Sequence, residues 1–400
     1  MPVLLSDLPP LAEDPLRRAI DAAYHRDEAA AVATLLDEVR LDPPTRERIT
    51  ARARRLATKL RAETAAQGGV EAFMHAYSLS TQEGVMLMCL AEALLRIPDA
   101  PTQDRLIRDK LGDVDWQRRV AQSESFLVNA SAFGLMLSGR LIAWDQPGEN
   151  VTTRLKSLVA RLGEPVLRQA LRQAMRILGH QFVLGQTIDQ AIDRAKRMQE
   201  QGFLYSYDML GEGAKTAADA ARYFKSYAQA LERIAGAASA AELMRRPSLS
   251  IKLSALHPRY EHAKGQRREA ELLPPLVDLL LRARMLDVPV TIDAEESERL
   301  EPSLDLFERL AAHERLRGWD GVGLAVQAYQ KRAVHVVAWL ADLARRTGRR
   351  IPVRLVKGAY WDAEIKRAQQ QGFSDYPVFT RKVATDVSYI ACAKHLLAAG

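Results

Sequence analysis

Short apolar segments alternate with amphipathic helices in the C-terminal half of the chain, and this alternation restricts the fold more than any other feature. The helical segments carry apolar residues at three- and four-residue spacing. The strands are expected at 203–208, 249–254, 288–293, 323–328 and 351–356, and the helices between them at 217–235, 272–286, 303–316 and 333–346. Such alternation is typical of a parallel sheet with helical crossovers.

Two α/β architectures are compatible with this order, a doubly wound sheet and a (β/α)8-type barrel. A doubly wound dinucleotide-binding sheet needs a third glycine after Gly211 and Gly213, and that glycine is missing. In a barrel, functional groups come from the carboxyl ends of several different strands. One polar or charged residue lies near the end of each expected strand: Asp208, Lys252, Asp293, Gln327 and Arg354. The sequence therefore predicts the barrel.

A barrel needs eight strands, and this sequence supplies five. The segment 384–399 is helical in pattern and is followed by Gly400, where a helix end and a further strand are expected. Either the last three strands lie outside this sequence, or the barrel is open. We favour a fragment that carries an incomplete barrel.

The N-terminal part, from about residue 14 to 180, has an almost wholly helical pattern. We expect a helical arm at 1–62, a helical domain at 63–183 and the barrel at 184–400. The segment 46–61 is rich in Arg and Lys, but no recognition turn, zinc ligands or interleaved aromatic residues accompany it. It is interpreted as the solvated face of a long helix, and DNA binding is not expected.

Composition limits the class of protein further. The net charge is +7 and the pI about 9.4, which weakly favours anionic partners, although an Arg-rich helix surface explains it as well. The two cysteines, Cys89 and Cys392, have no neighbouring His cluster, so neither a disulfide framework nor a metal site is predicted. The first eleven residues lack the basic start of a signal peptide, and a cytoplasmic protein is expected.

The stretch Arg354-Leu-Val-Lys-Gly-Ala-Tyr-Trp361 joins an apolar strand to a charged turn. Two cations there cost desolvation free energy unless anionic or strongly polar groups meet them. Gly358 carries no side chain and permits a close approach of the backbone. Two interpretations stay open at this point: a pair of salt-bridged cations at a strand end, or a binding site for an anionic ligand.

Several of these segments together resemble a known family. Four segments carry most of the resemblance: Ser250-Ile-Lys-Leu-Ser-Ala-Leu-His-Pro-Arg-Tyr260, Ile292-Asp-Ala-Glu-Glu296, Val326-Gln-Ala-Tyr-Gln-Lys-Arg332 and Arg354-Leu-Val-Lys-Gly-Ala-Tyr-Trp-Asp362. They are similar to the proline dehydrogenase module of the bacterial proline utilization A family. The segment from Tyr205 to Glu212 extends the match, and the helical lead-in is also similar to that family. A monofunctional proline dehydrogenase shares the barrel motifs and remains an alternative.

The resemblance implies FAD-dependent oxidation of L-proline to pyrroline carboxylate, with electrons passed to a membrane quinone. It places five residues at the substrate: Lys252 as the cation for the proline carboxylate, Asp293 and Asp208 as nearby carboxylates, Arg354 at the flavin ring and Tyr360 over the proline ring. A helix cap is the alternative role for Asp208. Two arginines that complete the carboxylate clamp in the family would lie beyond Gly400.

The same resemblance implies the residues that hold FAD, and it implies no metal. The cofactor contacts expected from it are Gln327, Arg354, Val356, Lys357, Gly358, Ala359, Trp361, Thr380, Arg381 and Lys382. Arg354 and Gln327 would bond to the flavin ring, and a hydroxyl and cations at 380–382 suit a pyrophosphate.

For the full-length protein, the resemblance implies a second, NAD-dependent half that oxidises glutamate semialdehyde. It also implies a homo-oligomer and peripheral contact with the inner membrane. Two other classes were weighed: a flavin barrel with a different substrate, and a non-catalytic helical adaptor with a degenerate barrel. The Lys252 and Asp293 pairing disfavours the first, and the five polar strand ends disfavour the second.

Overall fold

The computed structural model describes residues 14–66, 99, 101–102, 105, 183–238, 240 and 242–400. The chain divides into two compact units, Met1–Asp42 with Ala195–Gly400, and Pro43–Arg194. The expected helical domain at 63–183 lies almost entirely outside the described residues. The three domain boundaries taken from the sequence therefore stay predictions.

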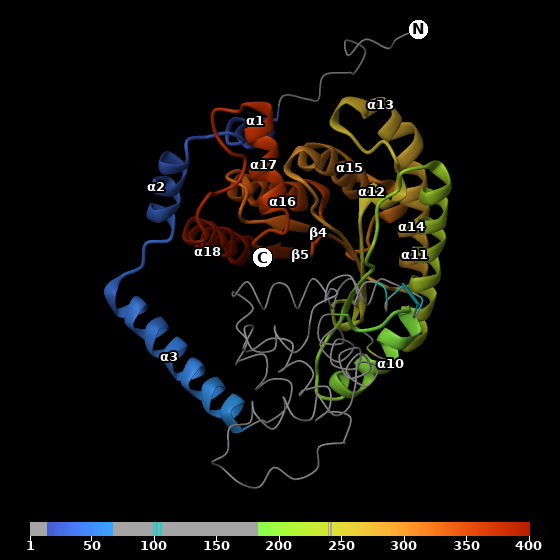
Figure 1. The fold of residues 1–400 in the computed structure, drawn as a ribbon, viewed down its shortest axis with the longest axis horizontal. Helices are drawn as coiled ribbons and strands as arrows, with labels where there is room; N and C mark the ends of the chain where they lie inside the picture. The colour runs from blue at the N-terminus through green and yellow to red at the C-terminus, as the bar shows by residue number, and fades with distance from the viewer. Residues whose placement is uncertain are drawn as a thin grey trace. The chain divides into compact units, whose positions relative to one another are not determined.

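A parallel sheet of five strands forms the centre of the first unit (Figure 1). Its order follows the sequence, and every neighbouring pair is parallel. The strands are β1 (Ser206–Asp208), β2 (Ser248–Ile251), β3 (Val290–Ile292), β4 (Val322–Gln327) and β5 (Val353–Val356). This sequential parallel order confirms the expected incomplete barrel, because each crossover places the next strand on the same side.

The helices predicted between the strands are present as α11 (Ala217–Ala237), α14 (Leu273–Leu286), α15 (Leu300–Ala312) and α16 (Ala333–Thr347), with ends shifted by a few residues. An additional short helix is α12 (Leu253–Leu256), and α17 (Trp361–Gln371) and α18 (Lys382–Ala399) follow β5. Shorter helical turns are η2 (Leu243–Arg245), η3 (His262–Lys264), α13 (Gly265–Arg267), η4 (Arg268–Leu272), η5 (Ser297–Arg299) and η6 (Glu314–Leu316). Their apolar faces cover the strands because Leu231, Leu280, Phe307 and Trp339 are all almost fully buried.

Four of the five strands are shorter than the sequence suggested, and β4 keeps its expected length of six residues. Lys252 and Asp293 each lie one position beyond their strand, and Arg354 lies inside β5 as expected. All four residues of β5 are half-buried. β5 is the last strand of the sheet and has a strand neighbour on one side only.

Side-chain alternation puts the polar residues of the strands on one face. In β1 the buried Tyr207 lies between the exposed Ser206 and Asp208. The register pairs Asp208 with Ser250, and Ala325 with Arg354. Since successive residues of a strand point to opposite faces, Ser250 and Lys252 share a side, as do Arg354 and Val356. In a barrel that side is the interior.

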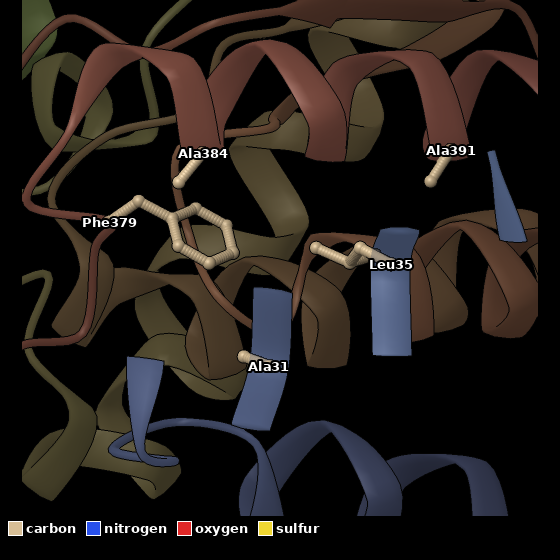
Figure 2. Packing of buried hydrophobic residues seen from close by; sticks show 5 residues of the cluster. All are labelled: Ala31, Leu35, Phe379, Ala384 and Ala391. Atoms are coloured by element: carbon tan, nitrogen blue, oxygen red, sulfur yellow. The ribbon is translucent and has the colours of Figure 1, made fainter. Parts of the chain in front are cut away.

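The part of the expected arm before Pro43 belongs to the same unit as the sheet, and the remainder, in α3 (Pro43–Ala66), belongs to the other unit. The helices of the first part are α1 (Pro15–Ala22) and α2 (Glu28–Glu38). Figure 2 shows the apolar packing between α2 and the region of α18: Ala31 and Leu35 of α2 lie against Phe379, Ala384 and Ala391. The arm is therefore part of the core of this unit.

The second unit is described mainly by α3 (Pro43–Ala66), and residue 194 divides α10 (Ile188–Gln199) between the units. The basic residues of α3 between 46 and 61 are exposed, as expected of a solvated helix face. Among the described helices, none is both long and apolar enough to cross a membrane. The apolar segment at 126–144 lies outside the described residues.

The packing of the arm gives a first testable prediction. Leu35→Ala should lower the free energy of unfolding by about 2–5 kcal/mol, because it removes a buried side chain and leaves a cavity. Its neighbour Leu36 is half exposed on the same helix, so Leu36→Ala should change it by less than about 0.5 kcal/mol. Urea unfolding of both variants measures the difference, and equal losses would show that α2 is not packed as described.

Candidate active site

Lys252 lies at the centre of a cluster of carboxylates at the carboxyl ends of the first three strands. Its Nζ is 3.2 Å from Glu212 Oε1, 3.2 Å from Asp293 Oδ2 and 3.5 Å from Asp208 Oδ1. An ammonium group has three hydrogens, and each points to a different carboxylate. Asp208 makes the longest of these contacts and is the most exposed of the three acids. The structure thus brings together three of the residues expected at the substrate, Lys252, Asp293 and Asp208.

Asp293 bridges two cations. Its Oδ2 contacts Lys252, and its Oδ1 accepts from Arg354 Nη2. The other nitrogen of the Arg354 fork donates to Ser250 Oγ at 2.6 Å. Because the Arg354 side chain remains 39% exposed, part of the guanidinium faces open space beside β5. Arg354 and Lys252 are consequently held in a fixed relation by one buried carboxylate.

Glu212 is a site residue that the sequence analysis did not single out. Its side chain is 1% exposed, and Oε2 has no hydrogen-bond partner among the described residues. Burial raises the pKa of Glu212 to about 8, against the opposing effect of Lys252. The available signal in the sequence was its position between Gly211 and Gly213, four residues after the end of β1.

The same cluster acts on the pKa of Lys252. Burial lowers this pKa, but the carboxylates of Glu212, Asp293 and Asp208 outweigh burial, so the net shift is upward. Lys252 is therefore a permanent cation over the physiological pH range. It can bind an anion but is a poor general base.

Asp208 does not have the capping role that was left open for it. The next helix, α11, is capped by Thr216, whose side chain accepts from the Asp219 N–H in a capping box. Asp208 is the last residue of β1 and its described contact is with Lys252. This placement fits a site carboxylate better than a helix cap.

Tyr360 lies four residues after the end of β5. Burial raises the pKa of Tyr360 to about 12, and the carboxylates of Glu295 and Glu296 add to this effect. Direct contacts join the other four expected substrate residues, Asp208, Lys252, Asp293 and Arg354.

Gln327, at the end of β4, ties two loops together. Its Nε2 donates to the Glu295 carbonyl at 2.8 Å, and its Oε1 accepts from the Ala359 N–H at 3.1 Å. Both ends of the Gln327 side-chain amide therefore bond to backbone groups of the protein. Glu295, which the sequence analysis did not select, in turn accepts from the Ser254 N–H at 3.0 Å. Gln327 thus braces the backbone after β5.

The turn after β5 has a restricted backbone. Gly358 has a φ of 140°, and a Cβ atom there would lie 2.3 Å from the Tyr329 ring. Only glycine fits this conformation and this close approach. The turn is therefore fixed against β4 while Val356 and Lys357 bond through their carbonyls to Ala328 and Tyr329.

The remaining expected cofactor residues lie in the turn after β5 and at the start of α18. Lys357 and Lys382 share one carboxylate, Asp386, and both stay largely exposed. Trp361 donates from Nε1 to the Phe379 carbonyl at 3.0 Å and is 42% exposed. Thr380 faces the arm, since its N–H donates to both oxygens of Glu28. The Arg381 carbonyl accepts hydrogen bonds from the N–H groups of Ala384 and Thr385 at the start of α18.

These residues fit a flavin dinucleotide on chemical grounds. Arg354, Lys357 and Lys382 are exposed cations around the end of β5, and the two lysines exceed their shared carboxylate by one charge. A dianionic pyrophosphate favours such a surface, and the electron-rich reduced flavin favours a permanently charged guanidinium. The two cations of the 354–361 segment nevertheless have carboxylate partners in the chain, as a purely structural pair would. The functional interpretation rests on their exposed faces.

Within the described part of the chain, no group of three or more His, Cys, Asp or Glu residues could hold a metal ion. Cys392 is a buried free thiol on α18, and burial raises the pKa of this thiol to about 12.

Comparisons with known proteins agree with this arrangement. A family model described as proline dehydrogenase matches residues 191–400, and one described as the proline utilization A proline dehydrogenase N-terminal domain matches residues 14–61. The chain belongs to the proline dehydrogenase family. Within it, the chain resembles the bifunctional protein PutA, which confirms the resemblance seen in the sequence.

Two curated relatives and one solved structure show the extent of this similarity. Over 96% of this chain, the sequence is 51% identical to the bifunctional protein PutA of Salmonella typhimurium. Over 94% of this chain, it is 49% identical to the bifunctional protein PutA of Rhizobium meliloti. A crystal structure of a Bradyrhizobium japonicum proline utilization A mutant aligns over 98% of this chain with a TM-score of 0.68 and 49% identity. The chain spans only 29% of the Salmonella protein, 30% of the Rhizobium protein and 38% of the crystallised chain.

A further family model, described as the DNA-binding domain of proline dehydrogenase, matches residues 69–182. Only a few residues of that segment are described. The description belongs to the family model, and the expectation that this chain does not bind DNA stays a prediction.

Glu212 gives a prediction for pH dependence. The folded protein keeps the Glu212 proton at pH values where the unfolded chain has lost it. Its contribution to stability is therefore fully present below the ordinary carboxyl pKa and is lost as the pH rises through about 8. Glu212→Gln, which is always neutral, should remove this part of the pH dependence. Urea unfolding at a series of pH values in that window measures it.

Glu232→Gln is the matched control, because Glu232 lies exposed on α11 beside Arg282. It should retain the parent's slope of unfolding free energy against pH. A Glu212→Gln protein with the same slope as the parent would contradict the raised pKa.

Proposed function

We propose that the full-length protein oxidises L-proline to pyrroline carboxylate, with FAD held at the carboxyl ends of the barrel strands and with electrons passed to a membrane quinone. One observation carries the proposal: in a chain of the proline dehydrogenase family, Lys252, Asp293, Arg354 and Tyr360 converge beside the exposed cations of the β5 turn.

The substrate end of the site suits an amino acid. Lys252 supplies a permanent cation for the proline carboxylate, and Asp208 is its weakest and most exposed partner. We infer that the substrate carboxylate takes the place of Asp208 on Lys252, while Asp293 and Glu212 continue to hold the ammonium. Asp293 then fixes the substrate cation relative to Arg354, and Tyr360 supplies the aromatic wall over the ring.

The cofactor end of the site suits an extended anion with a polar ring system. Arg354 and Gln327 are assigned to the flavin ring, and Val356, Lys357, Gly358, Ala359 and Trp361 to the chain that follows it. Thr380, Arg381 and Lys382 are assigned to the phosphates. When bound, FAD accepts the hydride from the ring carbon of the substrate. Gly358 lets the backbone turn approach closely, and Tyr360 excludes water from the reacting face.

For the whole protein, the similarity to bifunctional PutA proteins supports a second, NAD-dependent half that oxidises glutamate semialdehyde. We extend the proposal to a homo-oligomer in the cytoplasm with peripheral membrane contact for electron transfer. DNA binding is left out of it, because the basic residues of α3 lack a base-reading pattern. The competing functions are those of a monofunctional proline dehydrogenase and of a flavin barrel with another substrate.

The visible spectrum of the full-length protein tests the activity. A bound oxidised flavin should absorb blue light, and this absorption should bleach when L-proline is added in the absence of oxygen. Other amino acids should leave the absorption unchanged. A yellow protein that proline does not bleach would retain the flavin and reject the substrate. A colourless protein that takes up no FAD would reject both.

Two substitutions separate the two ends of the site. Lys252→Met should raise the proline concentration for half-maximal rate by about 10- to 100-fold and leave the flavin spectrum unchanged, since a charged hydrogen bond to substrate is lost. Arg354→Met should alter the flavin spectrum or slow its reduction. Steady-state kinetics and anaerobic stopped-flow reduction measure these effects.

Lys225→Met, on the exposed surface of α11, is the control for a lost positive charge. If Lys252→Met and Arg354→Met both behave like Lys225→Met, the site assignment is wrong.

A further inference from the structure

A buried polar network connects the N-terminal arm to the turn that carries the proposed cofactor and substrate contacts. Its central residue is Ser297, in the loop after β3, which is 1% exposed. The Ser297 N–H donates to Glu364 Oε1 at 2.6 Å, and its Oγ donates to Glu364 Oε2 at 2.6 Å. Glu364 lies in the first turn of α17 and is 2% exposed. One buried carboxylate thus joins the loop after β3 to the helix after β5.

The arm joins the same serine from the other side. Tyr24, just after α1, has its hydroxyl 3.2 Å from Ser297 Oγ. A serine hydroxyl has one hydrogen, and that hydrogen is committed to Glu364. The Tyr24 hydroxyl must therefore be the donor in its bond to Ser297. The direction of the network is fixed, from Tyr24 through Ser297 to Glu364.

Arg332 closes the network from the loop after β4. Its guanidinium lies 4.0 Å from the centre of the Tyr24 ring, and Nη2 donates to the Ser297 carbonyl. Arg332 is 2% exposed and keeps further bonds to Gln330 and Glu301. The loops after β3 and β4 and the helix after β5 therefore meet at Ser297, with the arm as a fourth partner.

The position of Glu364 gives the network a route to the site. The Glu364 N–H donates to the Tyr360 carbonyl, which places the carboxylate one helical turn after the 357–361 segment. Burial raises the pKa of Tyr329, and the nearby Glu364 carboxylate adds to it. The ring of Tyr329 is the one against which Gly358 packs. Glu364 thus lies behind the turn and does not itself contact the proposed ligands.

We propose that Tyr24, Ser297 and Glu364 form a positioning network in which the N-terminal arm fixes the 357–361 turn, and with it the Tyr360 side chain and the backbone assigned to FAD. This inference rests on the proposed function for its consequence in binding and catalysis. The placement of the turn itself can be measured without that function. The arm is then a working part of the site, even though none of its residues lies among the proposed ligand contacts.

Hydrogen–deuterium exchange on the full-length protein tests the network. Tyr24→Phe removes only the donated hydroxyl, and Glu364→Gln replaces one acceptor oxygen by a donor group. Each should speed exchange of the amides at 357–362 by about threefold or more, because local opening of that segment becomes easier. The double variant should exchange no faster than Glu364→Gln alone, since both changes break one network. Thermal midpoints should stay close to that of the parent.

The matched control is Glu308→Ala on α15, which removes an ion pair with Arg346 of α16 and should leave the 357–362 segment unchanged. If Glu364→Gln does not fold, Ser297→Ala with Tyr24→Phe forms the same cycle. Unchanged exchange at 357–362 would overturn the proposal. So would additive effects, or faster exchange spread evenly over the barrel with a lower thermal midpoint, because these indicate general loss of stability.

Titration of the flavin-free protein with FAD gives the second measurement. Tyr24→Phe and Glu364→Gln should each weaken FAD binding by about threefold to tenfold, again without additivity. A parent protein that binds no FAD would defeat the proposed function, and the exchange experiment would still decide on the network. Parent-like FAD affinity in both variants would overturn the claim that the network acts on the site.

Discussion

The rest of the site depends on the carboxylate bridge that Asp293 forms between Lys252 and Arg354. Lys252 and Arg354 come from strands that are not neighbours, and two cations so close together would repel each other in a partly buried region. One carboxylate with an oxygen for each of them removes this repulsion and sets their separation. The position of Asp293 one residue after β3, between β2 and β4 in the sheet, makes the bridge possible. The sheet order therefore determines the electrostatics of the site.

The parts that could be predicted from the sequence are those set by local pattern. Alternation of apolar strands and helices was enough to predict five parallel strands, because each strand and helix is a continuous segment with its own periodicity. Polar residues such as Lys252 and Asp293 stood out for the same reason, since they interrupt or end an apolar run. Strand ends were less well predicted, because Lys252 and Asp293 continue the extended pattern whether or not a neighbouring strand pairs with them.

The parts that could not be predicted depend on contacts between distant segments. Glu212 looks like a loop residue in a glycine-rich turn, and only the fold buries it beside Lys252. Glu364 looks like an ordinary acidic residue in the first turn of a helix, where carboxylates are common. Its burial against Ser297, 67 positions earlier, follows from the barrel order and from the arm, which no periodicity reveals.

The charges of the site divide along the sheet in a way that suits a two-ligand reaction. Around β1 to β3, the carboxylates of Asp208 and Asp293 and the largely protonated carboxyl group of Glu212 surround the single ammonium of Lys252. A substrate carboxylate can bind at this end only in place of one of these acids. Around β5, Lys357 and Lys382 share the single carboxylate of Asp386 and remain exposed, so this pair keeps a net positive charge that attracts an anion. Arg354 belongs to both ends, because Asp293 holds it from one side and its exposed edge faces the other. A small amino acid and a larger anionic cofactor would therefore meet at Arg354, where hydride transfer requires their reacting atoms to be adjacent.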